Sequence, residues 1–123
     1  MKLTLILRIL LGVLLLIFAI NKFAPFLPAP EPTGEAAVYL GGLMASGFTF
    51  PVIGILEIGV GIALLANKYV PLALVLFAPI SVNILLFHVT MDLANIPMGG
   101  AVFALNLALL FLHKKSYDSL LSA

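Results

Sequence analysis

The chain has 123 residues, of which 63% are hydrophobic and only 9% are charged. A soluble domain is about half apolar and about a quarter charged, so this composition is typical of an integral membrane protein. The net charge of +1, with six basic residues spread along the chain, argues against nucleic-acid binding, and the lack of cysteine excludes disulfide exchange, thiolate metal sites and iron–sulfur clusters carried by this chain.

The first apolar block begins after Lys2 and is interrupted only by Arg8. A signal peptide has a similar pattern, but no small-x-small cleavage site follows Ile20. We therefore expect a first transmembrane helix over residues 3–23. A helix of that length extends about 31 Å, which matches a hydrocarbon core of about 30 Å.

A proline-rich segment follows, with Pro25, Pro28, Pro30 and Pro32. Proline fixes φ and removes backbone donors, so this segment is expected to be an extended linker.

After Thr33, which can serve as an N-cap, apolar residues recur at the spacing of one helix face. They are Ala36, Tyr39, Leu40, Leu43 and Met44. The resulting helix, over about 35–46, is too short to span a bilayer. We expect it to lie at the interface as an amphipathic lid.

Proline in the first turn marks the second and third spans, expected at about 50–66 and 70–91 with Pro51 and Pro71 near their starts. Asn67 can take the left-handed conformation that ends the first of them. Pro79 lies inside the third span and predicts a kink.

The fourth span is expected at about 96–112, with Asn95 as its cap and Pro97 in its first turn. Four spans place both termini on one side of the membrane. On that side lie the basic residues Lys2, Arg8, Lys68, Lys114 and Lys115, whereas the other side has Lys22 with Glu31, Glu35 and Asp92. The positive-inside rule therefore predicts cytoplasmic termini and an extracytoplasmic lid.

The predicted fold is thus an all-α integral membrane four-helix bundle. Residues 1–123 form a single transmembrane domain, with a short extracytoplasmic amphipathic helix between helices 1 and 2.

A carboxylate lies within the glycine-rich second span: Glu57, close to Gly54, Gly59 and Gly61. Small residues let helices approach closely, and a membrane-buried carboxylate must be paired, protonated or hydrogen-bonded. Glu57 is expected about 9 Å below the outer face. The polar residues predicted at a similar depth, and so its candidate partners, are Lys22, His88, Asn21 and Asn83.

Each of these residues has a structural alternative. Glu57 can hold helices together or serve as a ligand or proton site, and we expect Lys22 to be an interface anchor that snorkels to the headgroups. His88 is expected to be a hydrogen-bonded core residue rather than a ligand to metal or haem. Tyr39 and Phe48 are expected to pack in the lid.

Two polar residues fall outside this layer. Arg8 is about half a membrane away from Glu57, so we expect it to snorkel to inner headgroups or to cap carbonyl groups. Asn106 is expected to form hydrogen bonds between helices. A bis-histidine haem site is excluded because His88 and His113 are predicted near opposite membrane faces.

The order and spacing of several residues resemble the DoxX family of small bacterial and archaeal four-helix membrane proteins. They are Arg8, Gly12, Lys22, Tyr39, Gly47-Phe48, Pro51, Glu57, Gly59, Gly61 and Phe87-His88. The resemblance implies a multi-pass protein of the cytoplasmic (inner) membrane. It also implies association with membrane redox complexes, since founding members are associated with a thiosulfate:quinone oxidoreductase.

The sequence therefore favours an accessory subunit of a membrane redox complex, or a binder of quinone or another hydrophobic ligand near Glu57. Quinone is the candidate cofactor; haem, iron–sulfur clusters and metal sites are not expected, and no catalytic residue is assigned. The alternatives are a structural or assembly protein without a ligand, and a small transporter. The glycine-lined faces permit a homo-oligomer or a membrane partner protein.

Overall fold

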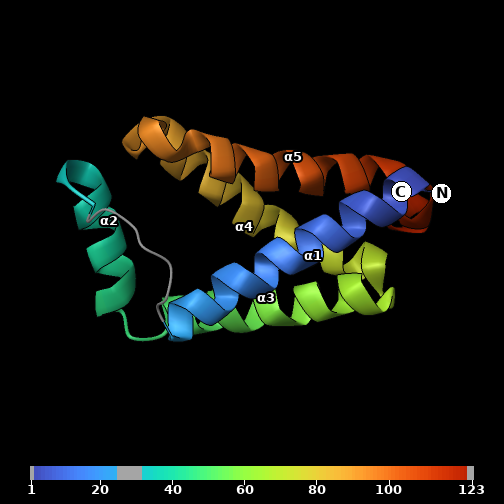
Figure 1. Cartoon of the computed structure of the whole chain (residues 1–123), viewed down its shortest axis with the longest axis horizontal. Helices are drawn as coiled ribbons and strands as arrows, with labels where there is room; N and C mark the ends of the chain where they lie inside the picture. Colours follow the sequence, from blue (N-terminus) through green and yellow to red (C-terminus); the bar gives the residue numbers. More distant parts are fainter. Residues whose placement is uncertain (1, 25–31, 122–123) are drawn as a thin grey trace.

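The computed structural model describes residues 2–24 and 32–121, and these ranges contain helices and no strand. The longer helices are α1 (Lys2–Phe23), α2 (Gly34–Ala45), α3 (Thr49–Ala66), α4 (Val70–Met91) and α5 (Ile96–Leu112) (Figure 1). Short 3₁₀ turns cover Leu93–Asn95 and Lys114–Tyr117, and α6 (Asp118–Leu121) follows the second of them. The expected all-α class is confirmed. Residues 25–31 of the predicted proline linker and the side chain of Asn95 lie outside the described part.

Three helices, α1, α3 and α4, are long and apolar enough to cross a membrane. A fourth candidate arises if α5 is taken together with the segment Lys114–Leu120, which bends away from it by 74°. The 22 residues of α1 and of α4 extend about 33 Å each, and the 17 residues of α5 about 26 Å. Length and composition therefore give three candidate spans in the described part of the chain, or up to four.

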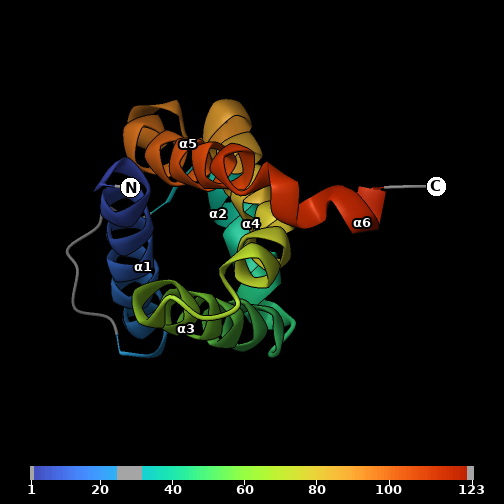
Figure 2. The ribbon, with the colours of Figure 1, turned by 90° about the vertical axis from the view of Figure 1, so that its right-hand side faces the viewer.

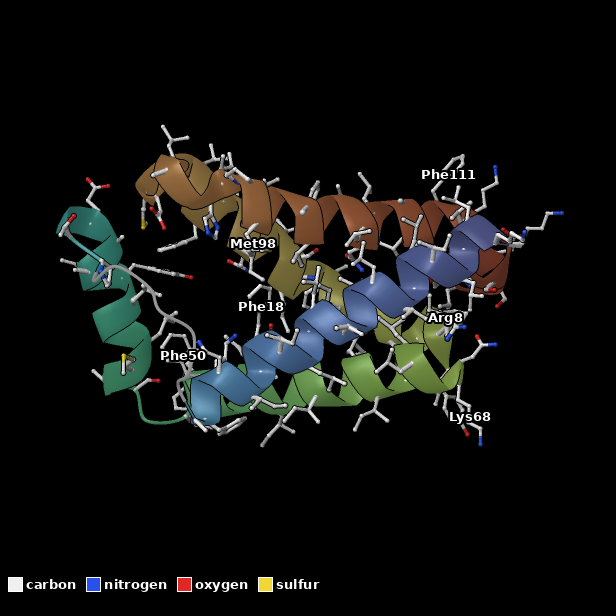
Figure 3. The ribbon with its side chains drawn as sticks, viewed as in Figure 1. Arg8, Phe18, Phe50, Lys68, Met98 and Phe111 are labelled. Atoms are coloured by element: carbon white, nitrogen blue, oxygen red, sulfur yellow. The ribbon has the colours of Figure 1, made fainter. Side chains whose placement is uncertain are left out.

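Four helices, α1, α3, α4 and α5, form a closed ring. In this ring α1 packs against α3 and α5, and α4 packs against the same two helices. Figure 2 shows this ring end-on. The shorter α2 lies across one end of the ring, and both termini lie at the opposite end (Figure 1). Figure 3 shows Arg8 and Lys68 at the end with the termini. The polar layer predicted from the sequence lies toward the α2 end.

The turn between α2 and α3 is held by the side chain of Ser46. Its hydroxyl oxygen accepts a hydrogen bond from the backbone N–H of Thr49 at 3.2 Å and lies 2.7 Å from the Thr49 hydroxyl. Between them Gly47 has φ +78°, a left-handed value that glycine adopts without strain. This turn fixes the start of α3, and with it the position of Glu57 about two turns later.

Two further helix ends were predicted from single residues. Asn67 has φ 57° and ψ 43° and ends α3 in the left-handed conformation, as expected. Thr33 occupies the N-cap position of α2 but makes no side-chain hydrogen bond there. The cap of α2 is therefore weaker than the sequence suggested. Pro79 is accommodated inside α4, which continues from Val70 to Met91.

The apolar core lies toward the end of the ring that holds the termini. It includes Leu11 and Leu15 of α1, Leu64 of α3 and Phe77 of α4, all with no exposed surface. The second half of α3 and the first half of α4 supply this packing because the turn at Asn67 joins them there. The other halves of the same helices surround the polar residues and the cavities described below.

Asn106 joins α5 to α4 inside this core, as the sequence predicted. Its Oδ1 accepts a hydrogen bond from the Ser81 hydroxyl at 2.9 Å, and its Nδ2 donates to the Leu74 carbonyl at 3.3 Å. Asn106 is 2% exposed, so these bonds satisfy an amide that is otherwise shielded from water.

Arg8 is buried in α1 and donates a hydrogen bond from Nη1 to the carbonyl of Leu64 near the C-terminal end of α3. Of the two expected roles, the structure shows carbonyl capping. A cation at the negative end of a helix dipole is a favourable arrangement.

Candidate functional site

Glu57 lies on the face of α3 that is buried, together with Gly54, Val60, Gly61 and Leu64. These positions recur at three- and four-residue spacing, which keeps them on one side of the helix. A Cβ at Gly61 would come within 3.1 Å of the Gly12 carbonyl oxygen of α1, and a Cβ at Gly54 within 2.6 Å of the Phe23 ring. The close approach of α1 shields Glu57, which is 1% exposed.

The predicted role of Gly59 is wrong. A Cβ there would meet nothing within 4 Å, so Gly59 does not mediate helix packing. The physical reason is its register: it lies two residues from Glu57, about 200° around α3 and hence on the opposite face. It borders a shallow apolar groove between α3 and α4 instead.

Lys22, in the last turn of α1, forms an ion pair with Glu57, with 2.8 Å between Nζ and Oε1. The prediction that Lys22 snorkels to the headgroups is therefore wrong. Its side chain is 24% exposed against 2% for Glu57, so the lysine reaches inward from the rim to a buried carboxylate. The pair joins α1 to α3, and a membrane-buried carboxylate needs such a counter-ion.

Both histidines make the same local contact. Nδ1 of His88 lies 2.8 Å from the Ile84 carbonyl oxygen, one turn earlier in α4, and Nδ1 of His113 lies 3.0 Å from the Leu109 carbonyl oxygen. The His88 ring is also held in place by Gly99 of α5, where a Cβ would come within 2.5 Å of Nδ1. His88 is thus a hydrogen-bonded, partly buried residue, as expected, and its ring is fixed by α5.

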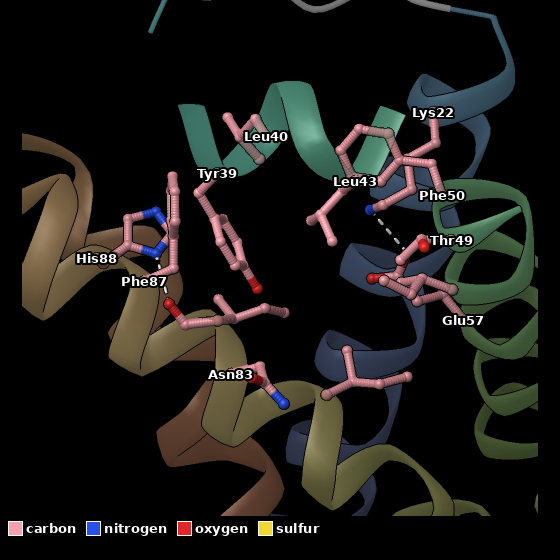
Figure 4. Close-up of a pocket in the computed structure, with 13 residues that line it drawn as sticks. Lys22, Tyr39, Leu40, Leu43, Thr49, Phe50, Glu57, Asn83, Phe87 and His88 are labelled. Carbon is pink, nitrogen blue, oxygen red and sulfur yellow. Dashed lines mark hydrogen bonds and ion pairs between the residues drawn. The ribbon is translucent and has the colours of Figure 1, made fainter. Parts of the chain in front are cut away.

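A cavity of about 350 Å³ lies beneath α2, between α3 and α4 (Figure 4). Four residues of the predicted polar cluster line it, namely Lys22, Glu57, Asn83 and His88. The rest of the lining is mainly apolar: Tyr39, Leu40 and Leu43 from α2, and Thr49, Phe50, Ile53, Ile80, Ile84 and Phe87 from α3 and α4. A mostly apolar pocket with a few polar groups at one wall is typical of small-molecule sites.

A second cavity of about 250 Å³ lies on the other side of the same wall, between α1, α4 and α5. Lys22, Glu57, Ile84 and His88 line both cavities. The remaining lining is Leu15, Phe18, Asn21, Met98, Gly99 and Val102. Asn21 therefore faces the second cavity rather than the first.

Asn83 and His88 are five residues apart on α4, which corresponds to about 140° around the helix, so they need not face the same neighbour. Both nevertheless line the first cavity. The Nδ2 of Asn83 donates a hydrogen bond to the Pro79 carbonyl at 2.9 Å.

The lid prediction is right for Tyr39 and wrong for Phe48. The Tyr39 ring of α2 lies 5.5 Å from the Phe87 ring of α4, centroid to centroid, and Tyr39 lines the first cavity. Phe48 is 65% exposed and lies outside the lining of both cavities, whereas Phe50 lines the first one. Phe48 precedes the first turn of α3, and two residues correspond to about 200° of rotation, so Phe50 points inward instead.

Sequence reasoning missed Phe50, Ile84 and Gly99. Only Gly99 carried a signal, as a glycine near the start of the fourth span. Its effect on His88 depends on the pairing of α4 with α5, which the sequence does not specify.

Within residues 2–24 and 32–121, no group of three or more His, Cys, Asp or Glu side chains could hold a metal ion.

Comparison with protein-family models, with curated proteins and with solved structures gave no match to the chain. The fold and site on their own define a helical protein with several potential membrane spans and a lidded, mostly apolar cavity.

Proposed function

We propose that this chain is a multi-pass membrane protein that binds a hydrophobic small molecule in the cavity beneath α2. The observation that supports this most strongly is the make-up of the cavity. Its volume of about 350 Å³ is within the range of about 300–1,000 Å³ common for ligand sites, and an ion pair and a histidine interrupt a mostly apolar wall. Such a cavity suits a molecule with one small polar end and an apolar body.

The proposed setting is a four-helix bundle in the cytoplasmic membrane of a bacterium or archaeon, with α5 as the fourth span. Both termini are proposed to be cytoplasmic and α2 extracytoplasmic. The charge distribution supports this orientation, because Lys2, Arg8, Lys68, Lys114 and Lys115 belong to the end with the termini. The cavity then lies in the outer leaflet, where a lipid-soluble molecule can reach it from the bilayer.

The proposed ligand is a quinone or another isoprenoid lipid. The DoxX resemblance favours this class and adds a second proposal, that the protein is an accessory subunit of a membrane redox complex with a membrane protein partner. Polar groups that can meet a quinone head are present at the cavity wall in Lys22, Glu57 and His88. Catalysis by this chain alone is not proposed.

The test is to purify the protein in a mild detergent and analyse the lipids and chains that accompany it. We expect about one quinone or isoprenoid lipid for each protein chain, or stoichiometric binding of added quinone. A preparation that retains no lipid and binds no added quinone would refute the proposal.

A structural role is the second candidate, because the Lys22–Glu57 pair joins α1 to α3 whether or not a ligand is bound. The variant Glu57→Gln separates the two. It keeps the shape of the side chain and removes its charge. Unfolding of the variant without loss of ligand would favour the structural role, and a folded variant that has lost its ligand would favour the binding site.

A further inference from the structure

A third cavity, of about 360 Å³, lies at the end of the ring that holds the N-terminus, where α1 begins and α3 ends. Its lining is Lys2, Thr4, Leu5, Arg8 and Asn67. Two of these side chains are cations, Thr4 and Asn67 can donate hydrogen bonds, and none is a carboxylate. The cavity shares no lining residue with the two cavities described above.

Arg8 is the buried cation of this cavity and is 8% exposed. Its Nη1 donates to the Leu64 carbonyl, which uses one of the five N–H donors of the guanidinium. The carbonyl end of a helix carries about half an elementary charge, which is less than the full charge of a guanidinium. A charge buried in a membrane protein normally has a counter-ion, yet Arg8 forms no ion pair with a described carboxylate.

The described carboxylates lie elsewhere in the fold. Glu35 belongs to α2, and Asp92 follows the end of α4 that α2 contacts. Glu57 pairs with Lys22 toward the same end. Asp118 begins α6, which extends away from α1 (Figure 2). No described carboxylate therefore balances the guanidinium, and the cavity suits an anion from outside the chain.

The surroundings of the cavity favour an anion that carries an apolar chain. The first backbone N–H groups of α1 have no partner within the helix and form the positive end of its dipole, which favours a phosphate group there. Exposed apolar side chains continue from this turn along α1, at Leu3, Leu5, Ile6 and Ile9. A phospholipid offers its phosphate to the cations and its acyl chains to these residues.

We propose that this cavity binds the phosphate group of a phospholipid, with Arg8 and Lys2 as its cations and Thr4 and Asn67 as further donors. Arginine suits this role because its planar guanidinium can donate two parallel hydrogen bonds to phosphate oxygens. In the proposed orientation of the chain the lipid belongs to the inner leaflet. The proposal is independent of the ligand site beneath α2, which lies at the other end of the ring.

The experiment uses native mass spectrometry of the full chain in a neutral detergent. It compares phosphatidylglycerol with diacylglycerol of the same acyl chains, which lacks the phosphate. Charge-assisted hydrogen bonds predict at least about tenfold tighter binding of phosphatidylglycerol. A second arm adds inorganic phosphate in excess. We expect it to leave the lipid bound, because it cannot make the acyl-chain contacts.

Two exposed lysines at this end of the ring provide a matched pair, since Lys2 lines the cavity and Lys68 does not (Figure 3). Lys2→Gln should weaken binding of phosphatidylglycerol about fivefold, the scale of one cation near a membrane surface. Lys68→Gln should bind like the wild type. Arg8→Gln removes the buried charge and should weaken binding at least about tenfold.

Equal binding of the two lipids by the wild type, or no binding of phosphatidylglycerol, would overturn the proposal. Displacement by inorganic phosphate would overturn the lipid as the source of the phosphate group. Equal losses in Lys2→Gln and Lys68→Gln would also contradict the proposal, because the charge of the whole end would then attract the lipid. The lysine pair decides the location even if Arg8→Gln does not fold.

Discussion

The Lys22 ammonium of α1 lies 2.8 Å from Oε1 of Glu57 of α3, and the two partners differ in burial. The carboxylate side chain is 2% exposed and the lysine side chain 24%. A buried charge that loses its partner is costly, whereas a charge at the rim can turn toward the headgroups or water. Loss of Lys22 is therefore expected to destabilise the fold more than loss of Glu57.

Lys22→Met should destabilise the fold by roughly 3 kcal/mol, because it leaves the Glu57 carboxylate buried without a cation. Glu57→Leu should cost less, since Lys22 can then reach the interface. The double variant should recover much of the loss of Lys22→Met. Reversible unfolding in detergent measures all three free energies. Equal losses in both single variants, or no rescue in the double variant, would contradict the asymmetry.

The contact between α1 and α3 predicts different effects for two glycines of the same helix. Gly61→Ala should cost about 1–3 kcal/mol, because its Cβ would lie 2.9 Å from the Leu16 side chain and 3.1 Å from the Gly12 carbonyl oxygen. Gly59→Ala, which meets nothing within 4 Å, should be neutral or stabilise the helix by up to about 1 kcal/mol. Thermal unfolding of both variants is the measurement. A Gly59→Ala variant as unstable as Gly61→Ala would argue against this helix contact.

Because α2 covers the first cavity, a larger side chain on α2 should fill part of that cavity. Leu43 lines the first cavity, so Leu43→Trp should occupy part of its volume and weaken ligand binding at least about tenfold with little change in stability. Its neighbour Met44 is 66% exposed and outside the lining, which makes Met44→Trp the matched control. Binding is read from the ligand retained through purification. A loss in both variants, or in neither, would show that the cavity beneath α2 is not the binding site.

Gly99 supports His88 from the neighbouring helix. Gly99→Ala would place a Cβ 2.5 Å from Nδ1, so the ring must move and its hydrogen bond to Ile84 must weaken. We expect ligand affinity to fall by about tenfold, as for the loss of one hydrogen bond. Gly100→Ala has open space around it and should bind the ligand like the wild type. Titration with added ligand distinguishes them, and unchanged affinity in Gly99→Ala would mean that the orientation of His88 does not matter.

Asn106 allows a test of the core that is independent of the ligand. Asn106→Leu removes its bonds to Ser81 and Leu74 and should destabilise the protein by about 1 kcal/mol, the scale measured for hydrogen bonds between membrane helices. Ligand binding should persist, because Asn106 is absent from the lining of both cavities. Parallel stability and binding measurements check this, and a loss of ligand in a stable variant would contradict it.

The helices themselves could be predicted because hydrophobic length and proline positions are local signals. Pro51 and Pro71 mark the first turns of α3 and α4, and Asn67 ends α3 in the predicted conformation. Depth was also informative: counting residues from the helix ends gave Glu57 and Lys22 similar depths, and the structure pairs them.

Counting residues gives the depth of a side chain. It gives neither the rotation of each helix about its axis nor which helices are neighbours. The sequence predicts that Lys22 reaches the headgroups because a lysine at a helix end usually snorkels. The actual direction of its side chain depends on how α1 crosses α3. The same limit explains why the sequence suggests Phe48 as a lid residue, although it lies outside the cavity lining, and why it groups Gly59 with Gly61. The second cavity depends on the packing of four helices, and no local pattern predicts it.

The most direct test of a ligand site at the Lys22–Glu57 wall is an experimental structure of the protein in native lipid. Our proposal predicts elongated non-protein density beneath α2, with its polar end next to the Lys22–Glu57 pair. Density for water alone, or α2 packed down so that Leu43 and Phe50 close the cavity, would contradict it.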